Sequence, residues 1–355
     1  MSTPKSPKSL VLVVGAGASK EVNLPVGAEL KQQIAKVLAV RIIGGFELAG
    51  GDDYITEAFR ILATSSGGRP GDMNSLLDAA RLICGAMPQA ISIDNFIDSH
   101  RGKEEIALCG KLAVARCILA AEAKSTLRFD RSNMYSRMNF DSLEDTWFSA
   151  FFKLLTENCR RQDLVARLQE VSIISFNYDR CVEHYLYSAL QNYFSLTPEE
   201  SAEALSSLEI YHPYGTVGVL PWMDKAGGIE FGATPRAGQL IEVAKQLRTF
   251  TEGTDARTSD VSAIRALVTT AERIAFLGFS FQRLNLELLL PDPQRKDPPR
   301  LRPVYATALG ISQSDAKLIA EDLAKMCGVL LERIHVGHLS CFNLFQEYWR
   351  SLSLC

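Results

Sequence analysis

The feature that most constrains the fold is a short apolar run, Leu10–Val14, which ends in the glycine-rich turn Gly15-Ala-Gly-Ala-Ser19. Five consecutive apolar residues with β-branched members are typical of a strand that is buried on both faces, as in a parallel sheet. Apolar residues then recur at helical spacing, which predicts a helix from about residue 26 to 40. A strand, a glycine turn and a helix in this order open a doubly wound α/β fold.

Further short apolar runs predict the rest of the sheet. They lie at residues 171–175, 208–211, 273–278, 303–306 and, more weakly, 333–336. Helical patterns separate most of them, at residues 180–191, 240–249, 261–270 and 312–326, and only helical patterns are visible between residues 45 and 165. We therefore predict an α/β fold, a Rossmann-like doubly wound parallel sheet built from residues 1–45 and 165–355, with an all-helical insertion over residues 46–164.

Charge and hydropathy narrow the classes of partner. The chain has 38 Lys and Arg residues against 41 Asp and Glu residues, so its net charge is −3 and direct nucleic-acid binding is not expected. The longest apolar stretch, residues 106–123, is interrupted by Lys111, Arg116 and Glu122, which argues against a membrane span. The apolar run near the N-terminus is too short for a signal peptide. We expect a cytoplasmic protein that does not bind a membrane.

The cysteines do not form a metal or redox motif. There are eight of them, and none forms a CxxC pair, so neither a zinc ribbon nor a thioredoxin-like motif is predicted. His335 and His338 have a spacing that suits a metal, but no third ligand accompanies them. We predict no metal site.

Candidate site residues follow four of the predicted strands. The first group is Gly15, Ala16, Gly17 and Ser19, where glycines allow a phosphate to approach the backbone and a helix start favours an anion. The third glycine of the dinucleotide fingerprint is missing, so a plain strand–turn–helix remains an alternative for this turn alone. The pattern is not a GxxxxGK[ST] phosphate loop, and ATP hydrolysis is not expected.

The second group is Asn177 and Asp179, in the segment Ser175-Phe-Asn-Tyr-Asp179. Residues two apart on an extended segment point the same way, so this pair suits an amide or a sugar. The alternative is an Asx turn that caps the helix beginning near residue 180.

The remaining two groups follow the strands at 208–211 and 273–278. His212, in Tyr211-His-Pro-Tyr-Gly-Thr216, is a candidate for proton transfer or a structural loop histidine. Gly278 and Ser280 offer close backbone approach and a hydroxyl for a ribose or phosphate, or form a simple turn. Because parallel strands end at one edge of the sheet, we expect all four groups to converge there.

With these turns the chain resembles the sirtuin superfamily and, within it, the bacterial sirtuin-like (SIR2-like) effectors of antiphage defence. Gly15-Ala-Gly-Ala-Ser19 with Leu24 and Pro25 looks like the family loop that cradles the NAD pyrophosphate. Phe176-Asn-Tyr-Asp179 is similar to the family motif in which the Asn orients the nicotinamide ribose and the attacking water and the Asp helps to hold the carboxamide.

Two further segments extend this resemblance. Gly278-Phe-Ser280 matches the turn that contacts the adenosine-side ribose. Ser92-Ile-Asp-Asn-Phe-Ile97 resembles a segment common in the helical insertion of the defence-type members.

The chain departs from the family at two places. It lacks the four-cysteine zinc module of the deacylases, so no zinc is expected. It also lacks the family's His-Gly pair, because Tyr214 stands directly before Gly215. We expect His212 to serve as the catalytic histidine, displaced by two residues. The alternative is that Tyr214 takes over this position, which is harder to reconcile with proton transfer because the ordinary pKa of tyrosine is about 10.

The resemblance implies an NAD⁺ glycohydrolase, for which NAD is the substrate and nicotinamide and ADP-ribose are the products. The alternatives are an NAD-dependent protein deacylase, which the missing zinc module disfavours, and a subunit that senses NAD or ADP-ribose without cleaving NAD. The resemblance also implies NAD depletion in abortive-infection defence against phage. It further implies a homo-oligomer that is activated by a separate partner, such as a HerA-like ring ATPase or a short Argonaute.

Overall fold

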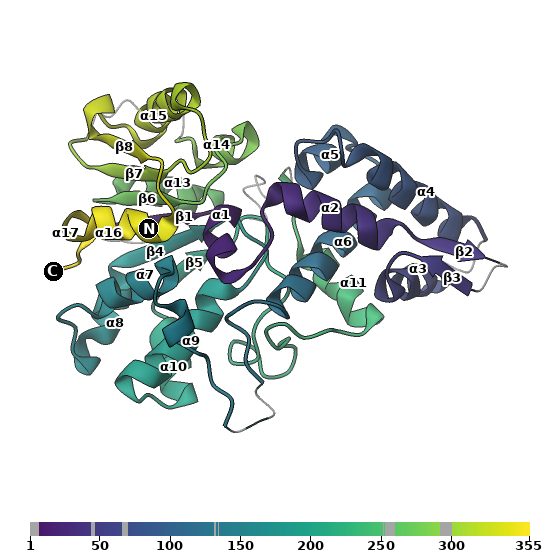
Figure 1. The fold of residues 1–355 in the computed structure, drawn as a ribbon, viewed down its shortest axis with the longest axis horizontal. Coiled ribbons are helices and arrows are strands. Elements are labelled where there is room, and N and C mark those ends of the chain that lie inside the picture. The colour runs from purple at the N-terminus through teal and green to yellow at the C-terminus, as the bar shows by residue number, and fades with distance from the viewer. Residues whose placement is uncertain are drawn as a thin grey trace, which may run out of the picture.

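A computed structural model describes residues 7–43, 47–65, 70–130, 133, 135–250, 252, 260–291 and 300–355. Among these residues, six parallel strands form one sheet in the order β5-β4-β1-β6-β7-β8 (Figure 1). The strands are β1 (Leu10–Val14), β4 (Val171–Ser175), β5 (Glu209–Tyr211), β6 (Ile274–Leu277), β7 (Val304–Thr307) and β8 (Ile334–Gly337). The predicted α/β Rossmann-like sheet is confirmed. Its strand order reverses beside β1, where β4 and β6 pair with opposite edges of the same strand.

The central strand shows why the sheet is buried on both faces. All five residues of β1 are buried, and they alternate between two hydrophobic clusters. Leu10 and Leu12 belong to one cluster, whereas Val11 and Val13 belong to the other. This is the alternation of a strand that is covered by helices on both sides, which explains its unbroken apolar sequence.

Two sets of helices cover the sheet (Figure 1). The cluster that contains Leu10 and Leu12 includes residues of α7 (Trp147–Thr156), α8 (Leu164–Gln169), α9 (Cys181–Phe194), α10 (Pro198–Leu205), α16 (Cys341–Glu347) and α17 (Trp349–Leu352). The opposite cluster includes residues of α13 (Val261–Thr270), α14 (Arg283–Leu289) and α15 (Gln313–Cys327). The helix start predicted at Ser312 is confirmed, because its hydroxyl accepts a hydrogen bond from the Asp315 backbone N–H at 3.1 Å.

A group of helices lies beside the sheet, on the right in Figure 1. It consists of α2 (Gly27–Leu38), α3 (Asp53–Ser65), α4 (Pro70–Ala86), α5 (Ile93–Ser99), α6 (Glu104–Glu122) and α11 (Ala237–Gln246). Helices α2, α4 and α11 all pack against the apolar α6. Helices α2 and α11 join this layer from outside the predicted insertion, residues 46–164, whereas α7, from inside it, packs with the helices that cover the sheet.

The prediction that this insertion is all-helical is wrong. Strands β2 (Arg41–Ile43) and β3 (Glu47–Gly50) pair antiparallel, with Ile43 opposite Glu47. Segments of three and four residues are too short to show an alternating pattern in the sequence, and the pairing that stabilises them comes from the partner strand.

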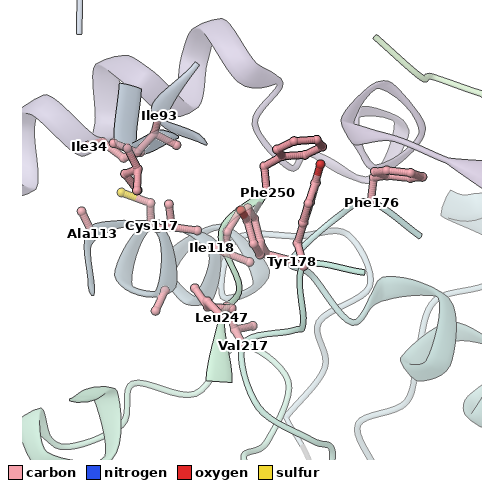
Figure 2. Packing of buried hydrophobic residues seen from close by; sticks show 14 of the residues in the cluster. Ile34, Ile93, Ala113, Cys117, Ile118, Phe176, Tyr178, Val217, Leu247 and Phe250 are labelled. Carbon is pink, nitrogen blue, oxygen red and sulfur yellow. The ribbon is translucent and has the colours of Figure 1, made fainter. Parts of the chain in front are cut away.

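The helical layer and the sheet share one hydrophobic cluster (Figure 2). Phe176 and Tyr178, from the turn after β4, belong to it together with Ile118 of α6 and with Val217 and Leu247. The turn after β4 therefore lies at the carboxyl end of the sheet and also packs against the helical layer.

The remaining described elements are short: α1 (Ala16–Ser19), η1 (Lys20–Val22), η2 (Asp141–Leu143), η3 (Arg161–Asp163) and η4 (Leu331–Arg333). In the described part of the chain, every helix is too short or too polar to cross a membrane.

Candidate functional site

A cavity of about 570 Å³ opens at the carboxyl ends of the strands. Its volume is within the usual range for small-molecule sites, and it lies where open α/β sheets bind their ligands. The predicted residues that line it are Gly15, Ala16, Gly17, Leu24, Pro25, Asn177, Asp179, Gly278 and Ser280. Two predicted residues, Ser19 and His212, are not among its lining residues.

The turns after β1 and β6 touch through their backbones. The N–H groups of Gly15 and Gly17 donate to the carbonyl oxygens of Leu277 and Gly278, each at 2.9 Å. A Cβ on Gly15 would lie 2.7 Å from the Gly278 oxygen, and one on Gly17 would lie 2.8 Å from the Gly278 Cα. These glycines are therefore required by the contact between the two turns, whatever the cavity binds.

This contact changes how the first turn can hold a phosphate. Because the Gly15 and Gly17 N–H groups donate within the protein, they are not available to a phosphate, and the Ala18 N–H is likewise bonded to the Gly15 oxygen. The glycines instead allow a ligand to come close to the backbone, because they carry no side chain. Among the described residues that line the cavity, Lys20 is the only basic one, and sequence reasoning missed it. Its ammonium lies near the surface, 2.6 Å from Glu29 Oε1.

Ser19 organises the site from behind the cavity. Its hydroxyl oxygen accepts a hydrogen bond from Asn177 Nδ2 at 2.9 Å, and its hydroxyl is hydrogen-bonded to the Asp179 carboxylate. Asp179 also accepts from the Cys181 backbone N–H at 3.1 Å, so the Asx turn at the start of α9 is present. Asp179 nonetheless lines the cavity, and its burial raises the pKa of its carboxyl. The structural and the functional interpretation of this residue are therefore compatible.

The amide of Asn177 is fixed in one orientation. Its Nδ2 donates to the Gly15 carbonyl oxygen at 3.1 Å as well as to Ser19, so both amide hydrogens are engaged. The side chain is 7% exposed and lines the cavity. Asn177 can therefore act on a ligand through its amide oxygen, as an acceptor for a hydroxyl or a water.

His212 lies behind Asn177. Its Nε2 is 2.7 Å from Glu183 Oε1, and its Nδ1 is 3.3 Å from the backbone oxygen of Asn177. Burial lowers the pKa of His212, but the adjacent Glu183 carboxylate outweighs burial, so the pKa is raised overall. Both ring nitrogens are thus engaged with the protein, and the geometry suits a residue that supports Asn177.

Tyr214, rather than His212, reaches the cavity. Its hydroxyl donates to Asn285 Oδ1 at 2.7 Å, and its ring packs edge-on against Phe176 with a centroid distance of 5.6 Å. Burial raises the pKa of Tyr214 well above its ordinary value. The position directly before Gly215 is therefore the one that faces a ligand, and in this chain it holds a phenol that stays protonated.

A carboxylate that sequence reasoning did not select lies on the same cavity. Asp94 is in the first turn of α5, whose N-cap Ser92 accepts from the Asn95 backbone N–H at 3.0 Å. Asp94 accepts a hydrogen bond from the Tyr178 hydroxyl. Removal from water raises the pKa of the Asp94 carboxyl. The segment Ser92–Ile97 had been noted only as part of the resemblance, because its spacing alone did not indicate contact with Tyr178.

Glu21 is the third acidic residue that lines the cavity, and it accepts hydrogen bonds from the first turns of two helices. Its carboxylate accepts from the Trp147 backbone N–H at 2.7 Å and from the Phe342 backbone N–H at 2.9 Å. These residues lie at the beginnings of α7 and α16, where unpaired N–H groups favour a negative charge. Burial nevertheless raises the pKa of Glu21. This arrangement is that of a structural residue.

A buried ion pair connects the site to the helical layer. Arg180 follows Asp179, and its Nη2 lies 2.5 Å from Glu122 Oε2 at the end of α6. The Arg180 side chain is 2% exposed and that of Glu122 is fully buried. Arg180 also donates to the Ile229 carbonyl oxygen at 2.6 Å. The turn with Asn177 and Asp179 is therefore anchored to the helical layer by a paired, well-bonded charge.

Among the described residues, no cluster of His, Cys, Asp and Glu side chains has the arrangement of a metal site. No protein-family model matches the chain, and a search of curated proteins finds no similar sequence. The cavity and the residues that line it are therefore the features of this chain that bear on its function.

Proposed function

We propose that the chain is an NAD⁺ glycohydrolase that cleaves the bond between nicotinamide and ribose. The observation that carries this proposal is the convergence of distant motif residues on one cavity at the point where the Rossmann-like sheet reverses its strand order. Gly15, Asn177 and Gly278 are far apart in the sequence, yet they meet at that cavity. This is the place where a dinucleotide binds to such a sheet.

The residues suit the parts of NAD that the reaction must hold. The contact between the Gly17 and Gly278 turns leaves no side chain to block the pyrophosphate, and Lys20 offers a positive charge at the cavity. The amide oxygen of Asn177 suits a ribose hydroxyl or a water, and Asp179 suits the carboxamide N–H groups.

The chemistry requires little beyond positioning. The bond between C1′ and the nicotinamide nitrogen breaks through an oxocarbenium-like state, nicotinamide leaves as a neutral molecule, and a water adds to C1′. The leaving group needs no proton, whereas the attacking water must lose one. The products are nicotinamide, ADP-ribose and a proton.

Chromatography of the purified chain after incubation with NAD tests the proposal. We expect nicotinamide and ADP-ribose from the wild type and at least a 100-fold lower rate from Asn177→Ala, which removes the positioned amide. The exposed Asn343→Ala is the matched control and should keep the wild-type rate. Thermal melting of both variants checks the fold. Wild-type turnover in a folded Asn177→Ala would refute this assignment of the site.

The second candidate function is a subunit that binds NAD or ADP-ribose without cleaving it. The specific observation in its favour is that Tyr214 lies where the resemblance places a histidine, with its hydroxyl bonded to Asn285. Calorimetry separates the two functions, since binding of NAD without product formation would support the sensor.

The cellular role follows the resemblance alone. We propose that the chain depletes NAD in antiphage defence as a homo-oligomer whose basal rate of NAD cleavage is raised by a separate partner protein. Light scattering and a rate measurement on the isolated chain test this proposal. A fully active monomer would contradict it.

A further inference from the structure

We propose that Asp94, held by Tyr178, is the proton acceptor for the water that attacks the ribose. This inference rests on the proposed function and adds a catalytic residue to it. It gives the segment Ser92–Ile97, which the sequence left without a role, a place in the reaction.

Asp94 lines the same cavity as the residues that would position the water. Tyr178 directly follows Asn177 in the chain, and its hydroxyl donates to Asp94 Oδ1. Asp94, Asn177 and Tyr214 all line the same cavity. The phenol of Tyr178 is 8% exposed and belongs to the cluster shared with the helical layer (Figure 2), so it holds the carboxylate in a fixed direction.

The groups around Asp94 make its carboxylate more basic. Tyr178 and Tyr214 face it from the turns after β4 and β5, and Asp98 lies one helical turn further on α5. Glu252, which also faces Tyr178, forms an ion pair with Lys111 of α6. Removal from water, which is the largest influence, raises the pKa of Asp94, and the hydrogen bond from Tyr178 partly opposes this. A raised pKa makes the ionised carboxylate a stronger proton acceptor.

The other candidate bases are engaged elsewhere. Asp179 accepts from the Cys181 backbone N–H and from Ser19, and Glu21 accepts from two helix starts. His212 is not among the cavity-lining residues and pairs with Glu183. Asp94 differs because the side chain that donates to it is a neutral phenol, and its own backbone N–H is the other donor.

The step is balanced without any other reagent. As the bond from C1′ to the nicotinamide nitrogen breaks, its electron pair leaves with nicotinamide. The water oxygen forms a bond to C1′, and one water proton moves to the Asp94 carboxylate. The proton then passes to solvent, which restores the carboxylate for the next turnover.

The test compares Asp94→Asn with Asp98→Asn, an acid on the same helix one turn away that is paired with Arg101. We expect Asp94→Asn to lower kcat at least 100-fold with an NAD dissociation constant within threefold of the wild type. Asp98→Asn should keep kcat within threefold. Melting curves establish that both variants are folded.

A pH profile distinguishes a base from a structural residue. The wild-type rate should fall as Asp94 becomes protonated at acid pH, and the residual rate of Asp94→Asn should lack this fall. In Tyr178→Phe the loss of the donated hydrogen bond raises the pKa of Asp94, so the fall should move to higher pH. An unchanged profile in Tyr178→Phe and Asp94→Asn would overturn the proposal.

The outcomes separate this inference from the proposed function. An active wild type with an active Asp94→Asn would overturn the role of Asp94 alone. A wild type that releases no nicotinamide would overturn the glycohydrolase and the role of Asp94 with it.

Discussion

The two sides of the cavity are built on different principles. The glycine floor, formed by Gly15, Gly17 and Gly278, is a contact between two backbones in which the N–H groups of one turn donate to carbonyls of the other. The acid wall, formed by Asp94, Tyr178 and Tyr214, is made of side chains from three separate elements. The floor is determined by close packing, whereas the wall is determined by side-chain hydrogen bonds, from Tyr178 to Asp94 of α5 and from Tyr214 to Asn285 of α14.

This difference separates what holds the site from what performs chemistry in it. On the floor, the N–H groups that sequence reasoning assigned to a phosphate are used to join the turns. On the wall, the reactive groups are a carboxylate and two phenols whose pKa values are raised by burial. Substitutions in the floor should therefore act mainly on stability, and substitution of Asp94 in the wall should act mainly on rate.

The largest effect is expected from Gly278→Ala in the floor. The residue has a φ of +56°, and a Cβ there would lie 2.0 Å from the Ala18 nitrogen. Backbone strain and overpacking together should lower the free energy of unfolding by about 4 kcal/mol, measured by urea denaturation. The control is Gly85→Ala on α4, where no atom lies within 4 Å of the added Cβ, and which should change stability by less than about 1 kcal/mol. Equal effects of the two substitutions would show that the close contact at Gly278 does not stabilise the fold.

A slightly smaller effect is expected where the turn with Asn177 and Asp179 is anchored to the helical layer. Glu122→Gln removes the charge that pairs with buried Arg180 and should lower the free energy of unfolding by about 3 kcal/mol. Glu144→Gln, in an exposed pair with Lys153, should cost less than about 0.5 kcal/mol in the same denaturation experiment. A loss below 1 kcal/mol at Glu122 would mean that the helical layer does not depend on this pair.

The His212–Glu183 pair should make stability depend on pH. His212 has a raised pKa in the folded state, so its contribution is complete below its unfolded pKa and is lost as pH rises through the folded pKa. We expect His212→Gln to cost about 2 kcal/mol at pH 6, and we expect the difference from the wild type to shrink toward pH 9. A difference that grows with pH would show that the pair is not held by a charged histidine.

The smallest effect is expected from Tyr214→Phe. It removes the hydrogen bond to Asn285 and should lower stability by about 1 kcal/mol. If Asp94 is the base, nicotinamide release should stay within threefold of the wild type, measured by chromatography. A loss of 100-fold would instead assign the proton transfer to Tyr214.

The sheet was predictable because its inner strands are short apolar runs that are buried on both faces, as in Leu10–Val14 and Val171–Ser175. The glycine turns and the pair Asn177 and Asp179 were predictable as site residues because they directly follow such strands. Local signals did not reveal β2 and β3, which are stabilised by their pairing.

The wall could not be predicted from the sequence. Asp94 meets Tyr178 across 84 positions of the chain, and only the packing of α5 against α6 brings them together. Which of His212 and Tyr214 reaches the cavity also depended on tertiary structure, because the two residues are only two positions apart. His212 pairs with the buried Glu183, which directs it away from the cavity.

A crystal structure of the Asn177→Ala chain with NAD tests the central claim most directly. The account predicts intact NAD with its pyrophosphate against Gly17 and Gly278, its nicotinamide ribose beside position 177, and Asp94 facing C1′. Nicotinamide bound away from position 177 and Asp94, or no dinucleotide in the cavity at saturating NAD, would contradict it.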